Sequence, residues 1–350
     1  MAYRHGPRAK LPTVQELIVH FGAGQATIVS ALDELEAQNV LYRKDRQGIF
    51  VSPKLNRKLI SILLDSQWLR AGSSPFWGQL WGLFAEEAER RTQTKNEDFL
   101  FQLVTAWQDP NEPLPDNMRH KIDAGIIHGV ISIGLGVVEA DWVINSSLPM
   151  VAFAGGGFWA VEMDFNRFID LGVEALVSRG CKQIAKVRAL PKADRHAPNP
   201  GIDFEEDQWF LGALKANGVP ETSGHLAQYP CANNWWDAPA YQEQGEYLAA
   251  ELFQGGNKLG LDGLLITDDL VASGMLAGLR HCGIVPGKDI AIASHSNAGS
   301  PVLYGCEDLL TVIEFDPGDI VRQMFSMLDA LMSGGVPNEQ DRIVRPALRS

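Results

Sequence analysis

The sequence has 350 residues, of which 45% are hydrophobic and 21% are charged, and its formal net charge is −13. That length allows two or three domains with buried cores, and the composition is ordinary for a soluble globular protein. Residues 1–58 hold nine Lys or Arg and five Asp or Glu, whereas the remainder holds 21 and 38. This distribution excludes non-specific polyanion binding by the whole chain, although the basic head alone could dock on DNA phosphates.

Cysteine usage and hydropathy exclude two further classes of protein. The four cysteines are widely spaced and form no CxxC pair, so neither a zinc site nor a disulfide framework is predicted. The first ten residues lack the apolar core of a signal peptide, and the longest apolar run, 124–138, contains His128 and is too short to cross a bilayer. We therefore expect a cytoplasmic protein with no membrane segment, no metal and no cofactor.

Two consecutive helices are predicted near the N-terminus. Thr13 followed by Glu16 forms a capping box, and apolar residues repeat at helical spacing from Val14 until Gly22 stops the helix. After a tight Gly-Ala-Gly turn comes GQATIVSALDELEAQ, residues 24–38, whose apolar residues fall at i, i+3, i+4 and i+7. Two helices joined by so short a turn predict a helix-turn-helix.

A basic hairpin follows the second helix, although that helix is acidic in its later turns. Apolar runs at 40–42 and 49–51 flank the basic tip, which predicts a winged helix at residues 1–55. In such modules the first turns of the second helix enter the major groove. The positive end of the helix then meets the phosphates, and the acids lie where repulsion is weaker. The residues predicted to contact DNA are Thr13, Gln25, Thr27, Ser30, Arg43, Lys44, Arg46 and Gly48.

The head resembles a known family. LPTVQEL and FGAGQATIVSALDELEAQNVLYRKDRQGIFV, within residues 11–51, are similar to GntR-type winged helices, with capping box, turn, helix and wing glycine in that order. The sequence departs from the family where only ten residues precede Leu11 and where Gly24-Gln25 replaces the usual Ser-Arg. The resemblance implies that the head binds operator DNA as half of a homodimer and that its first helix is truncated.

From Lys58 onward the pattern predicts alternating strands and helices. Strands are expected at 59–65, 128–134, 149–154, 184–188, 263–267 and 289–294, and helices at 79–91, 168–179, 206–217 and 271–282. Repeated βα units imply parallel sheets covered by helices, and the strands are too many for one doubly wound sheet. We therefore predict a two-lobed α/β domain at 58–350. Its lobe one is expected at about 59–156 and 290–315, and its lobe two at about 157–289 and 316–335.

A ligand site is predicted between the lobes. Ligands of open α/β sheets collect at the carboxyl ends of the strands, and in this chain those positions carry aromatic rings, carboxylates and amides. Rings that stack on C–H faces and acids that accept hydrogen bonds from hydroxyls are the chemistry of carbohydrate recognition. The residues predicted to bind a small-molecule effector are Asp65, Trp68, Ser74, Phe76, Trp77, Asp164, Trp235, Asp269 and Asn297.

The remainder also resembles a known family. KLISILLDSQWLRAG, VEMDFNRFIDLG and DGLLITDDLVASG are similar to the effector-binding domain of LacI and galactose-repressor type regulators, which are related to periplasmic sugar-binding proteins. The similarity covers residues 58–335. It implies a two-lobed, periplasmic-binding-protein-like domain that closes on its ligand, is usually dimeric, and has Phe76, Asp164 and Asp269 along the cleft.

The predicted cleft departs from that family at three places. Asp164-Phe165 stands where an Asp-Asn pair is expected, Glu206 stands where an Arg often grips the effector, and Ser296-Asn297 replaces an Asp pair. We therefore expect a pocket rebuilt for another ligand. A GntR-type head on a LacI-type body is similar to the arrangement of arabinose-repressor-type regulators, which favours a sugar as the effector.

Catalysis is not predicted. Asp268 and Asp269, or His295 with Ser294 or Ser296, are adjacent on the chain, whereas a nucleophile, a base and an orienting group must converge from separate elements. We predict a non-enzymatic transcription regulator, most simply a repressor, whose affinity for operator DNA is controlled by a small molecule. Two alternatives remain open: an effector sensor that has lost DNA binding, and a sugar-binding protein of another pathway.

Overall fold

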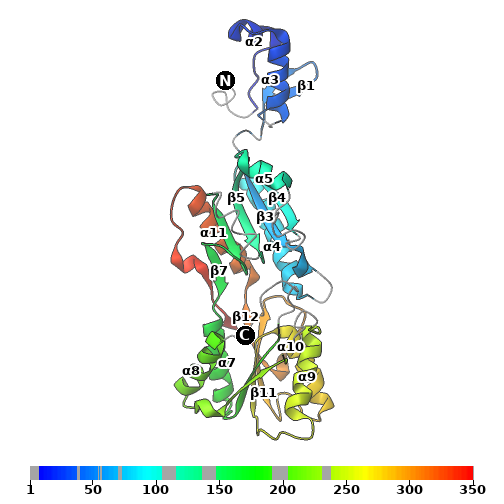
Figure 1. Cartoon of the computed structure of the whole chain (residues 1–350), viewed down its shortest axis with the longest axis vertical. Helices are drawn as coiled ribbons and strands as arrows, with labels where there is room; N and C mark the ends of the chain where they lie inside the picture. Colours follow the sequence, from blue (N-terminus) through cyan, green and yellow to red (C-terminus); the bar gives the residue numbers. More distant parts are fainter. Residues whose placement is uncertain are drawn as a thin grey trace.

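The computed structural model describes residues 8–349 except 38–39, 54, 56, 70–72, 105–115, 136–146, 191–203 and 231–237. Figure 1 shows three bodies in succession along the long axis: a small head, a first lobe and a second lobe. Each lobe is built on a six-stranded sheet. Within the described ranges, no helix combines the length and the hydropathy needed to cross a membrane.

The head is a winged helix, as the sequence predicted. Helix α2 (Val14–Phe21) begins at the capping box and ends at Gly22, whose φ of 61° suits glycine. Helix α3 (Gln25–Ala37) follows, and strands β1 (Leu41–Lys44) and β2 (Gly48–Val51) pair antiparallel as the wing. The apolar stripe of α3 is buried in a small core shared with α2 and the wing.

A further extended segment, residues 8–11, lies along β2. The backbone N–H of Leu11 donates to the carbonyl of Ile49 at 2.8 Å, one of the hydrogen bonds that join the two segments. The wing is therefore backed by chain that precedes α2, a pairing that the sequence pattern did not predict. Residues 1–7 lie outside the described residues, so the truncated first helix stays a prediction.

Lobe one is built on a parallel sheet with the strand order β13-β7-β6-β5-β3-β4. Its strands are β3 (Lys58–Asp65), β4 (Glu97–Val104), β5 (Ile127–Ile133), β6 (Met150–Phe153), β7 (Ala160–Met163) and β13 (Ile343–Val344). Its helical segments are η1 (Ser66–Leu69), α4 (Pro75–Thr94), α5 (Asp116–Asp123), α11 (Pro317–Met332) and η5 (Glu339–Arg342). Helix α4 starts at an N-cap serine followed by proline and buries a stripe that includes Phe76, Leu80 and Phe84.

Lobe two has the strand order β14-β12-β11-β10-β8-β9, parallel except for β14. Its strands are β8 (Ile184–Arg188), β9 (Gly224–Gln228), β10 (Gly263–Ile266), β11 (Ala291–Asn297), β12 (Thr311–Phe315) and β14 (Ala347–Leu348). Its helical segments are α7 (Phe165–Ser178), α8 (Phe204–Ala216), η2 (Glu221–Ser223), α9 (Tyr241–Phe253), α10 (Asp269–His281) and η4 (Glu307–Leu309). Every strand and helix predicted after Lys58 has a counterpart here or in lobe one. The prediction missed several elements of the described structure: β4, β7, β9, β12, β13, β14, α5, α9 and α11.

The chain passes between the lobes three times: from β7 to α7, from β12 to α11, and from β13 to β14. The predicted lobe boundaries are therefore wrong. Residues 290–315 form β11 and β12 of lobe two, whereas 316–335 contain α11, which packs on α4, β5 and β6 of lobe one. Residues 160–163, which the predicted boundaries assigned to lobe two, form β7 in the sheet of lobe one. Buried parallel strands of either sheet read as the same apolar runs, so the pattern does not tell which sheet a strand joins.

A buried ion-pair network fixes α4 to β4 and α11. The Arg91 side chain is only 3% exposed, and its Nε donates to Glu97 at 2.7 Å while its Nη2 contacts Asp329. Asp329 also pairs with Lys95 at 2.7 Å, and the Arg91 guanidinium lies 4.5 Å from the centre of the Phe325 ring. Helix α4 is therefore held at its C-terminal end by charge as well as by apolar packing.

Replacing Arg91 by Met is expected to lower the free energy of unfolding by about 3 kcal/mol, because Glu97 would stay buried without its cation. Urea denaturation followed by circular dichroism measures the change. The control is Arg90→Met, since Arg90 is 58% exposed and its pairing with Glu87 should contribute less than about 1 kcal/mol. Equal losses in the two variants would contradict a special role for the buried network.

Candidate effector site and DNA-binding head

The first turns of α3 face solvent. Gln25, Thr27 and Ser30 are exposed, whereas Ile28 and Leu32 on the other side of the helix are buried in the core of the head. The three polar side chains are therefore accessible to base edges or phosphates. Whether they contact DNA stays a prediction.

Two of the residues predicted to contact DNA are held by other side chains of the head. The hydroxyl of Thr13 donates to Glu16 Oε2 at 2.9 Å within the capping box. Arg43 donates through Nε to Glu36 Oε2 at 2.8 Å, through its backbone N–H to Glu36 Oε1 at 3.0 Å, and through Nη2 to Asp33. The acidic residues of α3 therefore bind the wing. This corrects the sequence interpretation, in which they only lay away from DNA.

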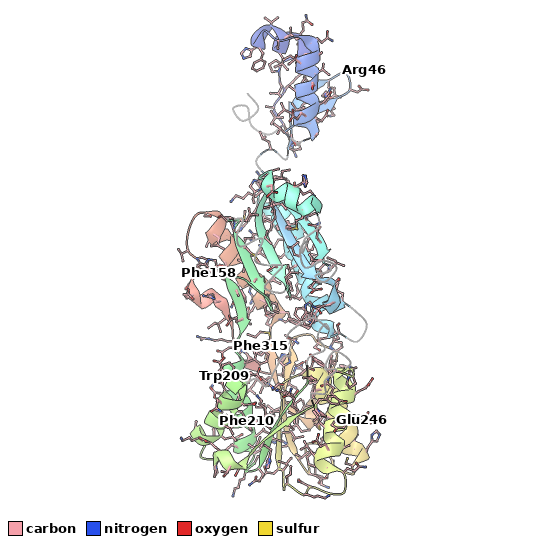
Figure 2. All side chains as sticks on the ribbon, viewed as in Figure 1. Arg46, Phe158, Trp209, Phe210, Glu246 and Phe315 are labelled. Carbon is pink, nitrogen blue, oxygen red and sulfur yellow. The ribbon has the colours of Figure 1, made fainter. Side chains whose placement is uncertain are left out.

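The tip of the wing carries the accessible cations. Lys44 and Arg46 are exposed, and Arg46 projects away from the head at the outer end of the hairpin (Figure 2). Gly48 has a φ of 117°, and a Cβ there would lie 3.0 Å from Cε of Lys10. Gly48 thus lets the exposed Lys10 lie against the wing. The head consequently presents Lys10, Lys44 and Arg46, while Arg43 is engaged internally.

The carboxyl edges of the two sheets face each other across the chain crossings. Strand β7 ends where the chain enters lobe two, and β12 ends at Phe315, where the chain returns to lobe one between the two lobes (Figure 2). All the predicted effector residues except Trp235 lie at these edges or at a crossing. Trp235 lies outside the described residues.

Lobe one contributes a cluster of aromatic rings to this region. Trp68 stacks on Trp77 with ring centroids 4.5 Å apart, and Trp77 meets the edge of Phe76 at 5.1 Å. Phe76 in turn lies 6.0 Å from Phe153, and Trp68 Nε1 donates to the carbonyl of Gly134 at 3.1 Å. The two tryptophans are half-buried and can offer ring surface to a ligand, whereas Phe76 is buried and supports them.

The predicted polar residues of lobe one have partners inside the lobe. The two carboxylate oxygens of Asp65 accept from the backbone N–H of Gln67 at 2.9 Å and from its side chain at 2.7 Å. Ser74 Oγ accepts from the backbone N–H of Phe76 at 3.3 Å as the N-cap of α4. Among the predicted residues of lobe one, therefore, the half-buried rings of Trp68 and Trp77 can offer surface to a ligand, whereas Asp65 is buried and bonded to Gln67.

Lobe two contributes two adjacent acidic side chains at the start of α10. Asp268 caps the helix by accepting from the backbone N–H groups of Leu270 at 2.9 Å and Val271 at 3.1 Å. Burial, and then the neighbouring Asp269, raise the pKa of Asp268 to about 7. Asp269 is 1% exposed and accepts from Ser300 Oγ at 2.9 Å, and burial raises its pKa as well. A carboxyl that holds a proton can donate to a ligand oxygen as well as accept from a ligand hydroxyl.

Asp164 occupies a crossing rather than a strand end. Its Oδ1 accepts from the backbone N–H of Arg167 at 2.9 Å and caps α7. Its own backbone N–H donates to the carbonyl of Val344 at 2.9 Å, which ties the first crossing to the third. Asp164 therefore caps α7 and joins two of the chain crossings. A contact between Asp164 and an effector stays a prediction.

Sequence reasoning missed an aromatic cage around His295. The imidazole lies 6.1 Å from the ring of Phe165, 6.0 Å from that of Phe168 and 5.6 Å from that of Phe315. Neither ring nitrogen has a hydrogen-bond partner within the described part of the chain, and burial lowers the pKa of His295 to about 4. The signal in the sequence was a run of polar residues, SHSN, at the end of an otherwise apolar strand.

Asn297 is the member of that run that was predicted to bind the effector. It is 3% exposed, and its Oδ1 has no partner among the described residues. The hydroxyl of Ser296 is likewise buried and unpartnered there. A buried acceptor without a donor is costly, so Asn297 Oδ1 is the atom at this edge that would gain most from a ligand hydroxyl or amine.

Among the described residues, the side chains considered for catalysis do not form a catalytic arrangement at these edges. Ser294 Oγ donates to the carbonyl of His295, so it makes no hydrogen bond of the nucleophile-to-base kind with the imidazole. Glu206 pairs with Lys186 at 3.3 Å inside lobe two. No cluster of His, Cys, Asp or Glu suited to a metal occurs in the described ranges.

A surface pocket of about 260 Å³ lies away from these edges. It follows α10 at the opposite edge of the sheet, between Arg280 and Leu309.

Comparison with known proteins identifies both parts of the chain. The family model for the periplasmic binding protein-like domain matches residues 173–350. The chain belongs to this family. The model for bacterial regulatory proteins of the gntR family matches residues 2–51. An uncharacterized HTH-type transcriptional regulator, YurK of Bacillus subtilis (strain 168), is 36% identical over 73 residues, which are 20% of this chain and 30% of that relative.

Solved structures share the fold of the periplasmic binding protein-like domain. A regulatory protein of the LacI family from Chloroflexus aggregans has a TM-score of 0.63 and 19% identity, and the match covers 83% of this chain and 96% of that one. A LacI family transcriptional regulator from Arthrobacter sp. FB24, in complex with lactose, has a TM-score of 0.58 and 19% identity over 84% and 98%. One from Enterococcus faecium with bound ribose has a TM-score of 0.55 and 17% identity over 84% and 97%.

The chain thus joins a gntR-type winged helix to a periplasmic binding protein-like domain with the fold of LacI family regulators. This is the architecture of a transcriptional regulator. It confirms the two resemblances and the fold class that the sequence predicted.

Replacing His295 by Phe is expected to flatten the acid dependence of stability of the periplasmic binding protein-like domain. Because burial lowers the pKa of His295 from 6.5 to about 4, the unfolded chain binds a proton between these values that the folded chain does not. The folded state therefore loses stability as the pH falls through this range. Between pH 7 and pH 5 the wild type should lose about 2 kcal/mol more than the variant in urea denaturation.

The control for this measurement is His281→Gln, since the His281 side chain is 73% exposed. It should follow the wild-type pH dependence. A parallel loss of stability in wild type and His295→Phe would contradict the assignment of the acid sensitivity to the buried imidazole.

Proposed function

We propose that the protein is a transcriptional repressor that binds operator DNA as a homodimer and whose operator affinity is set by a small carbohydrate held between the lobes. The observation that carries the proposal is the presence, in one chain, of an exposed surface on the head and of facing strand ends in the two lobes. The head exposes the first turns of α3 beside a cationic wing tip, and the carboxyl edges of both sheets meet at the chain crossings. Catalysis is not part of the proposal.

The DNA-binding half of the proposal rests on the division of charge within the head. Gln25 and Thr27 are exposed on the first turns of α3 and would reach base edges in the major groove, while the exposed Lys44 and Arg46 on the wing would meet phosphates. The carboxylates of α3 would otherwise repel the DNA, but Asp33 and Glu36 are paired with Arg43. This pairing reduces the net negative charge that the helix presents.

The effector half rests on the groups at the facing edges. Trp68 and Trp77 offer half-buried ring surface, Asp269 offers a carboxyl, and Asn297 offers an unpartnered acceptor. Ring faces with convergent carboxyl and amide groups suit the C–H faces and hydroxyls of a sugar. Two of the structures that share the fold hold lactose and ribose, which supports the same class of ligand.

Replacing Arg46 by Ala is expected to weaken DNA binding and to make it less dependent on salt. A lysine or arginine that neutralises one phosphate contributes about 0.9 to the slope of log affinity against log salt. DNA selected from a random-sequence pool by the wild-type protein serves as the probe, and its affinity is measured by gel shift between low and moderate salt. Lys288→Ala, an exposed cation of lobe two, is the control and should leave both quantities unchanged.

Failure of the wild-type protein to enrich any sequence at low salt would contradict the proposed function and favour the alternative of a sensor that does not bind DNA. An unchanged salt slope in Arg46→Ala would remove the wing tip from the interface while leaving the rest of the proposal open to test through Gln25→Ala.

Asp269→Asn is expected to abolish the thermal shift that the cognate ligand produces in the wild type. A panel of neutral sugars, sugar acids and sugar phosphates is screened by thermal unfolding, since a ligand that binds only the folded state raises the midpoint. Asp308→Asn, an exposed carboxylate at the other edge of the sheet, should respond as the wild type does. A shift produced only by a non-carbohydrate would contradict the sugar part of the proposal.

A further inference from the structure

A short loop after β11 connects the acid of lobe two to lobe one. In this loop, residues 297–300, Ser300 Oγ donates to Asp269 Oδ2 at 2.9 Å. Two residues earlier, the carbonyl of Ala298 accepts from Gln79 Nε2 of α4 at 2.7 Å, across the boundary between the lobes. The N–H of Ala298 donates to the carbonyl of Phe315 at 2.8 Å, which holds the loop at the crossing.

The loop is shaped around the Gln79 side chain. Gly299 has a φ of +80°, and a Cβ built there would lie 2.9 Å from Gln79 Nε2. The positive φ therefore favours glycine at this position, and a Cβ there would displace the Gln79 amide from its present place. Gly305, later in the same connection, has a φ of +75° but nothing within 4 Å of a built Cβ. Both glycines have a positive φ, but only a Cβ at Gly299 would meet the Gln79 side chain.

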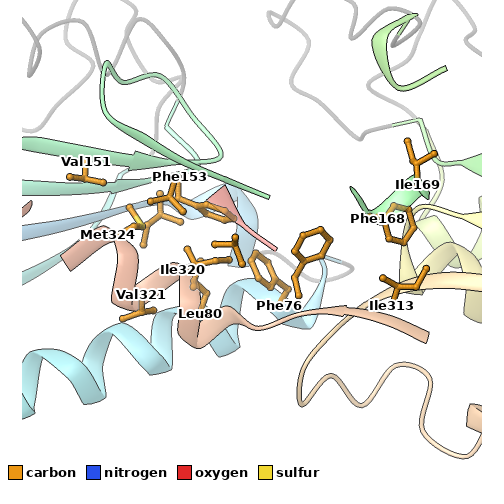
Figure 3. Close-up of a cluster of buried hydrophobic side chains, with 14 of the residues drawn as sticks. Phe76, Leu80, Val151, Phe153, Phe168, Ile169, Ile313, Ile320, Val321 and Met324 are labelled. Atoms are coloured by element: carbon orange, nitrogen blue, oxygen red, sulfur yellow. The ribbon is translucent and has the colours of Figure 1, made fainter. Parts of the chain in front are cut away.

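Helix α4 runs from this contact at the lobe boundary to the end of lobe one that adjoins the head. Its first turns are anchored in an apolar cluster that continues into lobe two, with Phe76 and Leu80 on one side and Phe168 and Ile313 on the other (Figure 3). The helix has 20 residues, so it spans about 30 Å. Just beyond its C-terminal end, the carbonyl of Asn96 accepts from the N–H of Lys58 at 3.0 Å, where the chain arrives from the head.

We propose that the loop 297–300 and Gln79 form a latch that couples the state of Asp269 to the position of α4 and, through α4, to the Lys58–Asn96 junction at the base of the head. The inference rests on the proposed function for its purpose, since Asp269 is the acid expected to meet the effector. A ligand that withdraws Asp269 from Ser300 would loosen the loop and its hold on Gln79. Gln79 is thus a positioning residue of the response and not a ligand contact.

The latch is tested without effector or DNA, by hydrogen–deuterium exchange of the full chain resolved to peptides. In Gly299→Ala, exchange should rise about fivefold in residues 75–80 and at the Lys58–Asn96 junction, the factor expected from the loss of one ordinary hydrogen bond. Gly305→Ala should leave both regions unchanged. Gln79→Met keeps the length of the side chain without its donor and should reproduce the Gly299→Ala result.

Ser300→Ala tests the link to Asp269. It removes the hydroxyl donor, so the latch requires the same rise in exchange in residues 75–80. Changes confined to residues 297–300, or equal changes in Gly299→Ala and Gly305→Ala, would overturn the proposal. Because the readout needs no bound molecule, failure of the latch is distinguishable from failure of the proposed function, which would show as absence of DNA binding in the wild type.

Discussion

The structure depends on one constraint of chain topology: every crossing between the lobes begins at the carboxyl edge of a parallel sheet. Strands β7, β12 and β13 all end at a crossing, so the two carboxyl edges must face each other. The strand ends that collect polar and aromatic side chains in open α/β sheets are thereby gathered from both lobes into one region. A small molecule bound there would contact both lobes and could therefore bind different lobe arrangements with different affinity.

The head follows a second constraint, set by charge. An acidic recognition helix is compatible with DNA binding only if its carboxylates are compensated or kept away from the phosphates. Asp33 and Glu36 are compensated by Arg43, and that arginine fixes the wing to α3. Lys44 and Arg46 stay exposed at the end of the hairpin. Asp33 and Glu36 thereby orient the wing. Removing them would release Arg43, but it would also loosen the hairpin that carries Lys44 and Arg46.

Local features could be predicted from the sequence, and long-range ones could not. The capping box and Gly22 define α2 because their physics is contained within a few residues, and β10 lies within the predicted residues 263–267 because it is a short apolar run. The lobe that α11 joins depends instead on a crossing that no local pattern records. Gln79 and Ala298 are 219 residues apart, and their contact has no signature in either segment. The predicted effector residues lie at the facing sheet edges because strand ends can be recognised in the sequence, and their contact with an effector stays a prediction. The aromatic cage of His295 was missed because that residue was considered only as a catalyst.

The central claim is that one chain couples a DNA-binding head to a ligand held between two lobes. Isothermal titration of the carbohydrate selected by thermal shift, into the full chain with and without saturating selected DNA, tests it most directly. Linkage requires that DNA change the affinity for the carbohydrate by the same factor by which the carbohydrate changes the affinity for DNA, typically about 5–150-fold. The account predicts two equal factors different from one. A carbohydrate affinity that is the same with and without bound DNA would contradict it.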